Sequence, residues 1–172
     1  MKAFINRDLI TQTGVDSGAL TMLGSVVRNF PEPGEYLGTV FQGDREGARF
    51  QLAVDKESAA MQVDIDLANL SAAPREECPC KEGSGGGLRR FVVNPKGYVV
   101  FHVSRGPGGY AVRVAGVAGE HQGKPFDSRE LQEGDLFAVT LIRPGAYSVS
   151  NLSNKARGEI VVAYPKAGKA PF

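Results

Sequence analysis

Hydrophobic and polar residues alternate along several stretches of the chain, with the period of two that is typical of half-buried β-strands. In residues 61–67 every second position is hydrophobic, and the positions between them are Gln or Asp. Two further alternating runs come before this one, in residues 35–54, and turn-rich or polar residues separate the three. Residues 34–70 are therefore predicted to form a first group of strands, each with one face toward a core and one toward water.

A second group of strands is predicted in residues 91–172. Two of its runs flank the turn Gly106-Pro107-Gly108-Gly109, where glycine supplies the positive φ values of a tight hairpin. Three more runs follow, at 136–142, 146–150 and 159–164. Between the two groups, residues 71–90 contain two prolines, a charge cluster and Gly-Ser-Gly-Gly-Gly, which predicts a linker or loop.

About eight strands with short connections, and no alternation of strands with helices, favour an all-β fold. We expect an antiparallel β-sandwich, with a closed β-barrel as the alternative. At 172 residues the chain is long enough for one β-domain with a sizeable core, so a single domain over residues 1–172 is predicted.

Residues 1–33 lack this alternation and are interpreted as an N-terminal extension with one short helix. Ser17 could cap a segment in which four hydrophobic residues fall at helical spacing before Pro31. These four residues are Leu20, Leu23, Val27 and Phe30. Such a stripe either closes an open end of the sandwich or binds a partner subunit, and it is our candidate partner-binding site.

Composition and charge narrow the classes of function. No run of about 18 apolar residues occurs, so we expect no membrane partner. The N-terminus has no signal-peptide pattern and the two cysteines are only two residues apart, which favours the cytoplasm and argues against a disulfide framework. The 20 basic and 19 acidic residues are interspersed, so no nucleic-acid partner is expected.

Residues 134–162 resemble the last two strands of cupredoxins, where a strand leads into a Pro-Gly-x-Tyr turn, a ligand-bearing loop, a glycine and a final apolar strand. Pro144, Gly145, Tyr147 and Gly158 fit this frame. The resemblance implies a cupredoxin-like, Greek-key sandwich. Cupredoxins place Cys, His and usually Met in the loop after the tyrosine, whereas residues 148–157 contain none of these, so the copper site of the family has no counterpart there.

Cys78-Pro79-Cys80 is the most suggestive local motif. Two thiolates could hold a soft metal, Zn or Cu, if His102 and His121 supply the remaining ligands. The alternative is two reduced cysteines on a solvated loop, with His102 a partly buried strand residue. Cys78, Cys80, His102 and His121 are therefore our candidate metal ligands.

No coherent catalytic constellation is evident. The chain has only two histidines and no Gly-x-Ser-x-Gly motif, so the sequence does not support a Ser-His-Asp site. Asp64 and Asp66 are a pair of carboxylates on one strand face, and we interpret that face as solvated. We therefore expect a non-enzymatic protein without a cofactor that acts in binding or assembly as a homo-oligomer. The alternatives are a metal-binding or redox protein that uses Cys78, Cys80 and His102, and an enzyme with a site beside residues 119–135.

Overall fold

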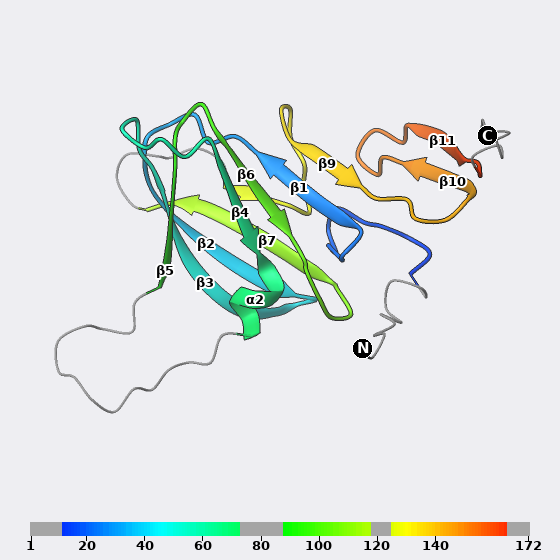
Figure 1. The fold of residues 1–172 in the computed structure, drawn as a ribbon, viewed down its shortest axis with the longest axis horizontal. Coiled ribbons are helices and arrows are strands. Elements are labelled where there is room, and N and C mark those ends of the chain that lie inside the picture. The colour runs from blue at the N-terminus through cyan, green and yellow to red at the C-terminus, as the bar shows by residue number, and fades with distance from the viewer. Residues whose placement is uncertain (1–11, 73–87, 118–124, 165–172) are drawn as a thin grey trace, which may run out of the picture. The chain divides into compact units, whose positions relative to one another are not determined.

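The computed structural model describes residues 12–72, 88–117 and 125–164. Apart from one short helix, the regular elements of these residues are β-strands, which confirms the all-β prediction (Figure 1). The chain divides into two compact units, Met1–Val139 and Thr140–Phe172. The single domain expected over residues 1–172 stays a prediction. No helix among the described residues has the length and apolar character needed to cross a bilayer.

Two sheets form the sandwich of the first unit, and neither closes into a barrel. The five-stranded sheet has the order β5-β3-β2-β7-β8, and the four-stranded sheet has the order β4-β6-β1-β9. The strands of the first sheet are β5 (Arg89–Val93), β3 (Arg45–Val54), β2 (Gly34–Gln42), β7 (Tyr110–Gly116) and β8 (Phe126–Asp127). Those of the second are β4 (Gln62–Asp66), β6 (Tyr98–His102), β1 (Gly24–Arg28) and β9 (Leu136–Val139).

Most strand pairs are antiparallel, as predicted, but two pairs at the sheet edges are parallel. β5 runs parallel to β3, and β4 runs parallel to β6. The reason is the path of the chain, which alternates between the sheets from β3 to β4, to β5 and to β6. Successive strands within one sheet are then separated by a strand in the other sheet, and they point the same way.

Hydrophobic side chains from both sheets meet in one core. Phe50 of β3 contacts Phe101 of β6, with ring centroids 6.4 Å apart, and Phe101 stacks on Phe126 of β8 at 5.7 Å. Phe91 of β5 packs edge-on against Phe50 at 5.7 Å. Gly38 leaves room for this cluster, because a Cβ atom at that position would lie 2.0 Å from the Phe50 ring.

The helix predicted before Pro31 does not form, and this prediction was wrong. Residues 24–28 form the strand β1. Before it, the backbone N–H of Leu20 donates to the carbonyl of Tyr110 at 2.7 Å, and the N–H of Tyr110 donates to the carbonyl of Leu20 at 3.1 Å. Gly24 and the β-branched pair Val26-Val27 favour a strand over a helix. The long-range pairing with β6 and β9 then decides the outcome.

The hairpin predicted around Gly106-Pro107-Gly108-Gly109 is also corrected. Its two strands exist, but β6 belongs to the four-stranded sheet and β7 to the five-stranded sheet, so they do not pair with each other. The glycines do adopt positive φ, with 88° at Gly106, 85° at Gly108 and 80° at Gly109. The turn therefore carries the chain from one layer of the sandwich to the other.

The six-residue helix α2 (Leu67–Ala72) follows β4 directly and reaches into the segment predicted as a linker, 71–90. Residues 73–87 of that segment lie outside the described part of the chain. The second unit contains a two-stranded antiparallel sheet of β10 (Gly145–Ser150) and β11 (Arg157–Val162), drawn in orange and red in Figure 1.

Candidate interaction site

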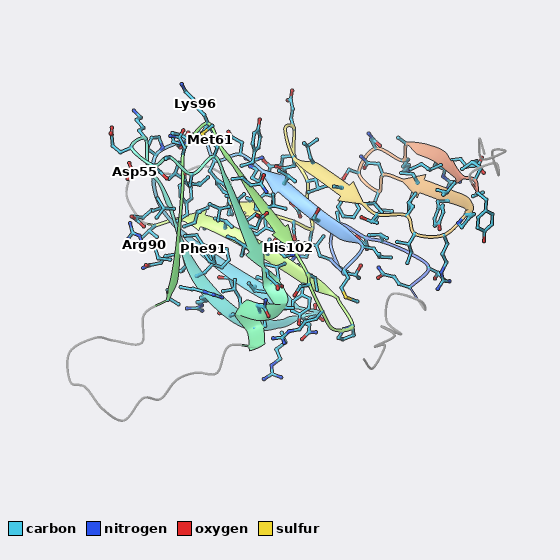
Figure 2. The ribbon with its side chains drawn as sticks, viewed as in Figure 1. Asp55, Met61, Arg90, Phe91, Lys96 and His102 are labelled. Atoms are coloured by element: carbon cyan, nitrogen blue, oxygen red, sulfur yellow. The ribbon has the colours of Figure 1, made fainter. Side chains whose placement is uncertain are left out.

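The predicted metal ligands are only partly described by the structure. His102 ends β6 (Figure 2), where the parallel register sets it opposite Asp66 of β4. Cys78, Cys80 and His121 lie outside the described residues. Among residues 12–72, 88–117 and 125–164, no group of three or more His, Cys, Asp and Glu side chains is arranged to hold a metal ion. The Zn or Cu site stays a prediction.

Asp66 accepts hydrogen bonds from two parts of the chain, the start of α2 and Ser104. Its Oδ1 accepts from the backbone N–H of Ala68 at 3.1 Å and of Asn69 at 3.3 Å, so it caps the start of α2. The backbone N–H of Ser104 donates to the same oxygen at 3.3 Å, and the Ser104 hydroxyl donates to Oδ2. Asp66 thus fastens the end of β4 to α2 and to the chain leaving β6.

These contacts also determine the ionisation of Asp66. Partial burial acts to raise its pKa, but the hydrogen bonds from Ser104 and Asn69 and the nearby His102 outweigh burial, so the pKa lies below the ordinary value. A Ser-His-Asp triad needs the serine to hydrogen-bond to the histidine. The Ser104 hydroxyl instead donates its hydrogen bond to Oδ2 of Asp66. The contacts of Asp66 are therefore those of a helix cap and of a link to Ser104.

The predicted partner-binding stripe lies mainly in the core. Leu20, Leu23 and Phe30 are buried, and Phe30 packs against Tyr36 with ring centroids 5.4 Å apart. Val27 lies in β1, opposite Val100 and Leu136, and is partly exposed. Burial of three of the four side chains removes the exposed stripe on which this prediction depended.

The hairpin of β10 and β11 carries two exposed hydrophobic side chains, Val149 and Ile160, on one face and a third, Val161, on the other. Residues opposite each other in an antiparallel pair share a face, and Tyr147 pairs with Ile160 while Gly145 pairs with Val162. One face therefore consists of Tyr147, Val149, Ile160 and Val162, which we call the apolar hairpin face. Val149 and Ile160 are each 47% exposed.

The opposite face of the hairpin is largely polar. Its members are Ala146, Ser148, Ser150, Arg157, Glu159 and Val161. The hairpin is thus amphipathic, the pattern of a strand pair that covers a core on one side. Within the described residues it remains a two-stranded sheet, and two strands alone are marginally stable in water.

Local sequence explains the two ends of the hairpin. At the start of β10, Gly145 adopts a φ of 155°, and the Tyr147 hydroxyl donates to the carbonyl of Arg143 at 2.7 Å. In the connecting loop, Asn151 Oδ1 accepts from the backbone N–H of Ser153 at 2.9 Å, and Asn154 Oδ1 accepts from Ala156 at 2.9 Å. Asparagine side chains that hydrogen-bond to the backbone two residues on are typical of such turns.

The same corner occurs at the start of β2. Pro33-Gly34-Glu35-Tyr36 matches Pro144-Gly145-Ala146-Tyr147, Gly34 has a φ of 151°, and the Tyr36 hydroxyl donates to the Glu32 carbonyl at 2.8 Å. Burial, then the neighbouring Glu32, raise the pKa of Tyr36, which keeps this hydroxyl protonated as a donor.

The correspondence extends into the following strand. Gly34 pairs with Val54 and Tyr36 with Leu52, just as Gly145 pairs with Val162 and Tyr147 with Ile160. Our sequence reasoning noted the second Pro-Gly-x-Tyr motif and missed the first, although both are visible in the sequence. The β2–β3 hairpin therefore shows what surrounds this motif inside a sandwich.

Comparison with known proteins gave no match to a family model, a curated protein or a solved structure. The relationship to cupredoxins stays a prediction.

Proposed function

We propose that this protein is a non-enzymatic binding or assembly protein that acts as a homo-oligomer. The observation that supports the proposal is the apolar hairpin face, of which Val149 and Ile160 are exposed. Apolar side chains alternate with serines along β10, and Ile160 and Val162 of β11 lie on the same face as those apolar side chains, which matches the pattern of a surface that another element covers.

The β2–β3 hairpin supports the proposal by comparison. Its inward residues Tyr36, Phe50, Leu52 and Val54 face the core and are buried. Tyr147 and Ile160 occupy the positions that Tyr36 and Leu52 occupy there, because each tyrosine follows the shared corner and pairs across to an apolar residue. A hairpin that has this pattern and pairs with no third described strand is the kind of element that another chain can complete.

The test is the mass of the untagged full-length protein in solution, purified without chelator. Sedimentation equilibrium over a range of protein concentrations should show species heavier than the 18.3 kDa chain. A single species of monomer mass at every concentration would refute the homo-oligomer. Native mass spectrometry of the same sample would report a bound metal, the outcome expected from the alternative use of Cys78, Cys80 and His102.

A further inference from the structure

Each strand of the β10–β11 hairpin has one edge that pairs with no other described strand. Unpaired edges invite pairing with another chain, and proteins normally protect them with charged residues or proline. β11 carries Arg157 and Glu159, whereas β10 has neither a charged residue nor a proline from Gly145 to Ser150. The β10 edge is therefore the unprotected one.

The β2–β3 hairpin indicates what such an edge accepts. Its first strand, β2, starts with the same Pro-Gly-x-Tyr corner and pairs on its outer edge with β7, an antiparallel strand. β10 is the first strand of the other hairpin, and its outer edge is the corresponding one. An antiparallel strand with alternating apolar and polar residues would complete it in the same way.

We propose that β10 of one copy pairs antiparallel with β10 of a second copy across a two-fold axis. The product is a four-stranded sheet in which the two β10 strands are central and the two β11 strands form the edges. This inference rests on the proposed homo-oligomer and names its contact. A two-fold interface uses the same surface on both copies, which an uncharged strand permits without opposing like charges.

The two-fold axis also selects the register. An axis perpendicular to the sheet sets one residue opposite its own copy, so the apolar hairpin faces of both copies lie on the same side. With Ser148 at the axis, Tyr147 of each copy lies opposite Val149 of the other, an aromatic and β-branched pair of the kind that stabilises sheets. With Tyr147 at the axis, Gly145 would enter the ladder, where glycine has no side chain to contribute. We therefore place Ser148 at the axis.

Pairing through the β10 edge accounts for a stable contact between two copies better than packing through the apolar hairpin face alone. Two strands of six residues present a face of roughly 20 Å by 10 Å, well below the about 800 Å² per partner of a standard interface. Backbone hydrogen bonds along β10 add a contribution that does not depend on that area. The pairing is short, so the dimer is expected to dissociate on dilution.

The first experiment compares Ser148→Lys with the matched control Ser153→Lys in sedimentation equilibrium of the full chain. Lysine at 148 sets two like charges opposite each other at the axis, so at least a tenfold weaker dimer is expected. Ser153 is exposed in the loop after β10, and lysine there adds the same charge away from the contact, so an unchanged dimer is expected.

The second experiment uses Ser148→Cys in a Cys78→Ser, Cys80→Ser background. Residues directly opposite in an antiparallel pair have Cα atoms about 4.5–5.5 Å apart, within the range of a disulfide. Mild oxidation should give a covalent dimer with Ser148→Cys, and little with Ser153→Cys in the same background. Cross-linking detects the contact in a folded chain. It therefore still tests the β10 pairing if Ser148→Lys weakens the dimer only by unfolding the hairpin.

The outcomes separate the two proposals. A monomeric wild-type chain at all concentrations would overturn both the homo-oligomer and this contact. A wild-type oligomer that survives Ser148→Lys, with no covalent dimer from Ser148→Cys, would overturn the β10 pairing and leave the homo-oligomer standing. A dimer weakened by Ser148→Lys alone, and trapped by Ser148→Cys alone, is the result that we expect.

Discussion

Replacing Asp66 tests whether the Asp66, His102 and Ser104 cluster is a structural cap. Asp66→Ala removes the cap of α2 and the acceptor for Ser104, so the free energy of unfolding should fall by about 2–3 kcal/mol. Asp66→Asn keeps one oxygen for the helix cap but places an amide where the Ser104 hydroxyl needs an acceptor. Its cost should be about 1 kcal/mol.

The assay is urea unfolding followed by circular dichroism, extended to a double-mutant cycle with Ser104→Ala. The cycle isolates the interaction between the two side chains, and we expect a coupling free energy of about 1 kcal/mol. Equal losses from Asp66→Ala and Asp66→Asn would show that the cap contributes nothing. A coupling of zero would show that the hydrogen bond between Ser104 and Asp66 is not formed.

The pH dependence of stability gives an independent check with a definite sign. The pKa of Asp66 is lower in the folded chain than in the unfolded chain, where it is about 3.9. The ionised carboxylate therefore contributes stability that is fully present above the unfolded pKa and is lost as pH falls through the folded pKa. The difference in stability between wild type and Asp66→Ala should shrink on acidification below about pH 4. A difference that grows there would contradict the reasoning.

Two further predictions concern the corner and the core. Gly38→Ala would put a methyl group against the ring of Phe50 and should destabilise the protein by about 1–3 kcal/mol in urea unfolding, whereas Gly158→Ala, which meets no atom within 4 Å, should be close to neutral. If the two variants unfolded alike, the close approach of Gly38 and Phe50 would be refuted. Tyr36→Phe should cost about 1 kcal/mol because its hydroxyl bond is partly buried, and Tyr147→Phe less than about 0.5 kcal/mol because that bond is exposed. A larger loss for Tyr147→Phe would mean that its corner is covered in solution.

The strands were predictable wherever apolar and polar residues alternate along the chain. Period-two alternation located β4, where Val63 and Ile65 alternate with Gln62, Asp64 and Asp66, and β10, where Tyr147 and Val149 alternate with serines. The same pattern did not predict the N-terminal segment correctly, because its apolar residues fit both the period of a helix and the period of a strand. Leu20 and Phe30 are buried, as a helical stripe would require, but so is Val26, which lies outside that stripe. The pairing of Leu20 with Tyr110, about 90 residues away, decides between the two, and local sequence does not contain it.

The candidate site shows the same division between local and long-range information. The turn and tyrosine of the Pro-Gly-x-Tyr corner could be read from the sequence, since glycine and proline have specific backbone requirements there. The free edge of β10 could not be read, because it depends on which strands the rest of the chain supplies. The glycine-rich turn after β6 gives a second example. Its positive φ values were predictable from the glycines, but the sequence did not indicate that the next strand, β7, belongs to the other sheet.

The two hairpins that share this corner differ in what the chain provides around them. β2 and β3 have nine and ten residues, and they gain β7, β5 and a second sheet that covers their inward side chains. β10 and β11 have six residues each and gain none of these within the described part of the chain. The β10–β11 hairpin keeps the Pro-Gly-x-Tyr corner and the alternation of β10, but no described strand extends it. Its local sequence is therefore that of part of a larger sheet. A second copy supplies the missing strand without any new sequence feature, since the strand that β10 needs on its free edge is one like itself.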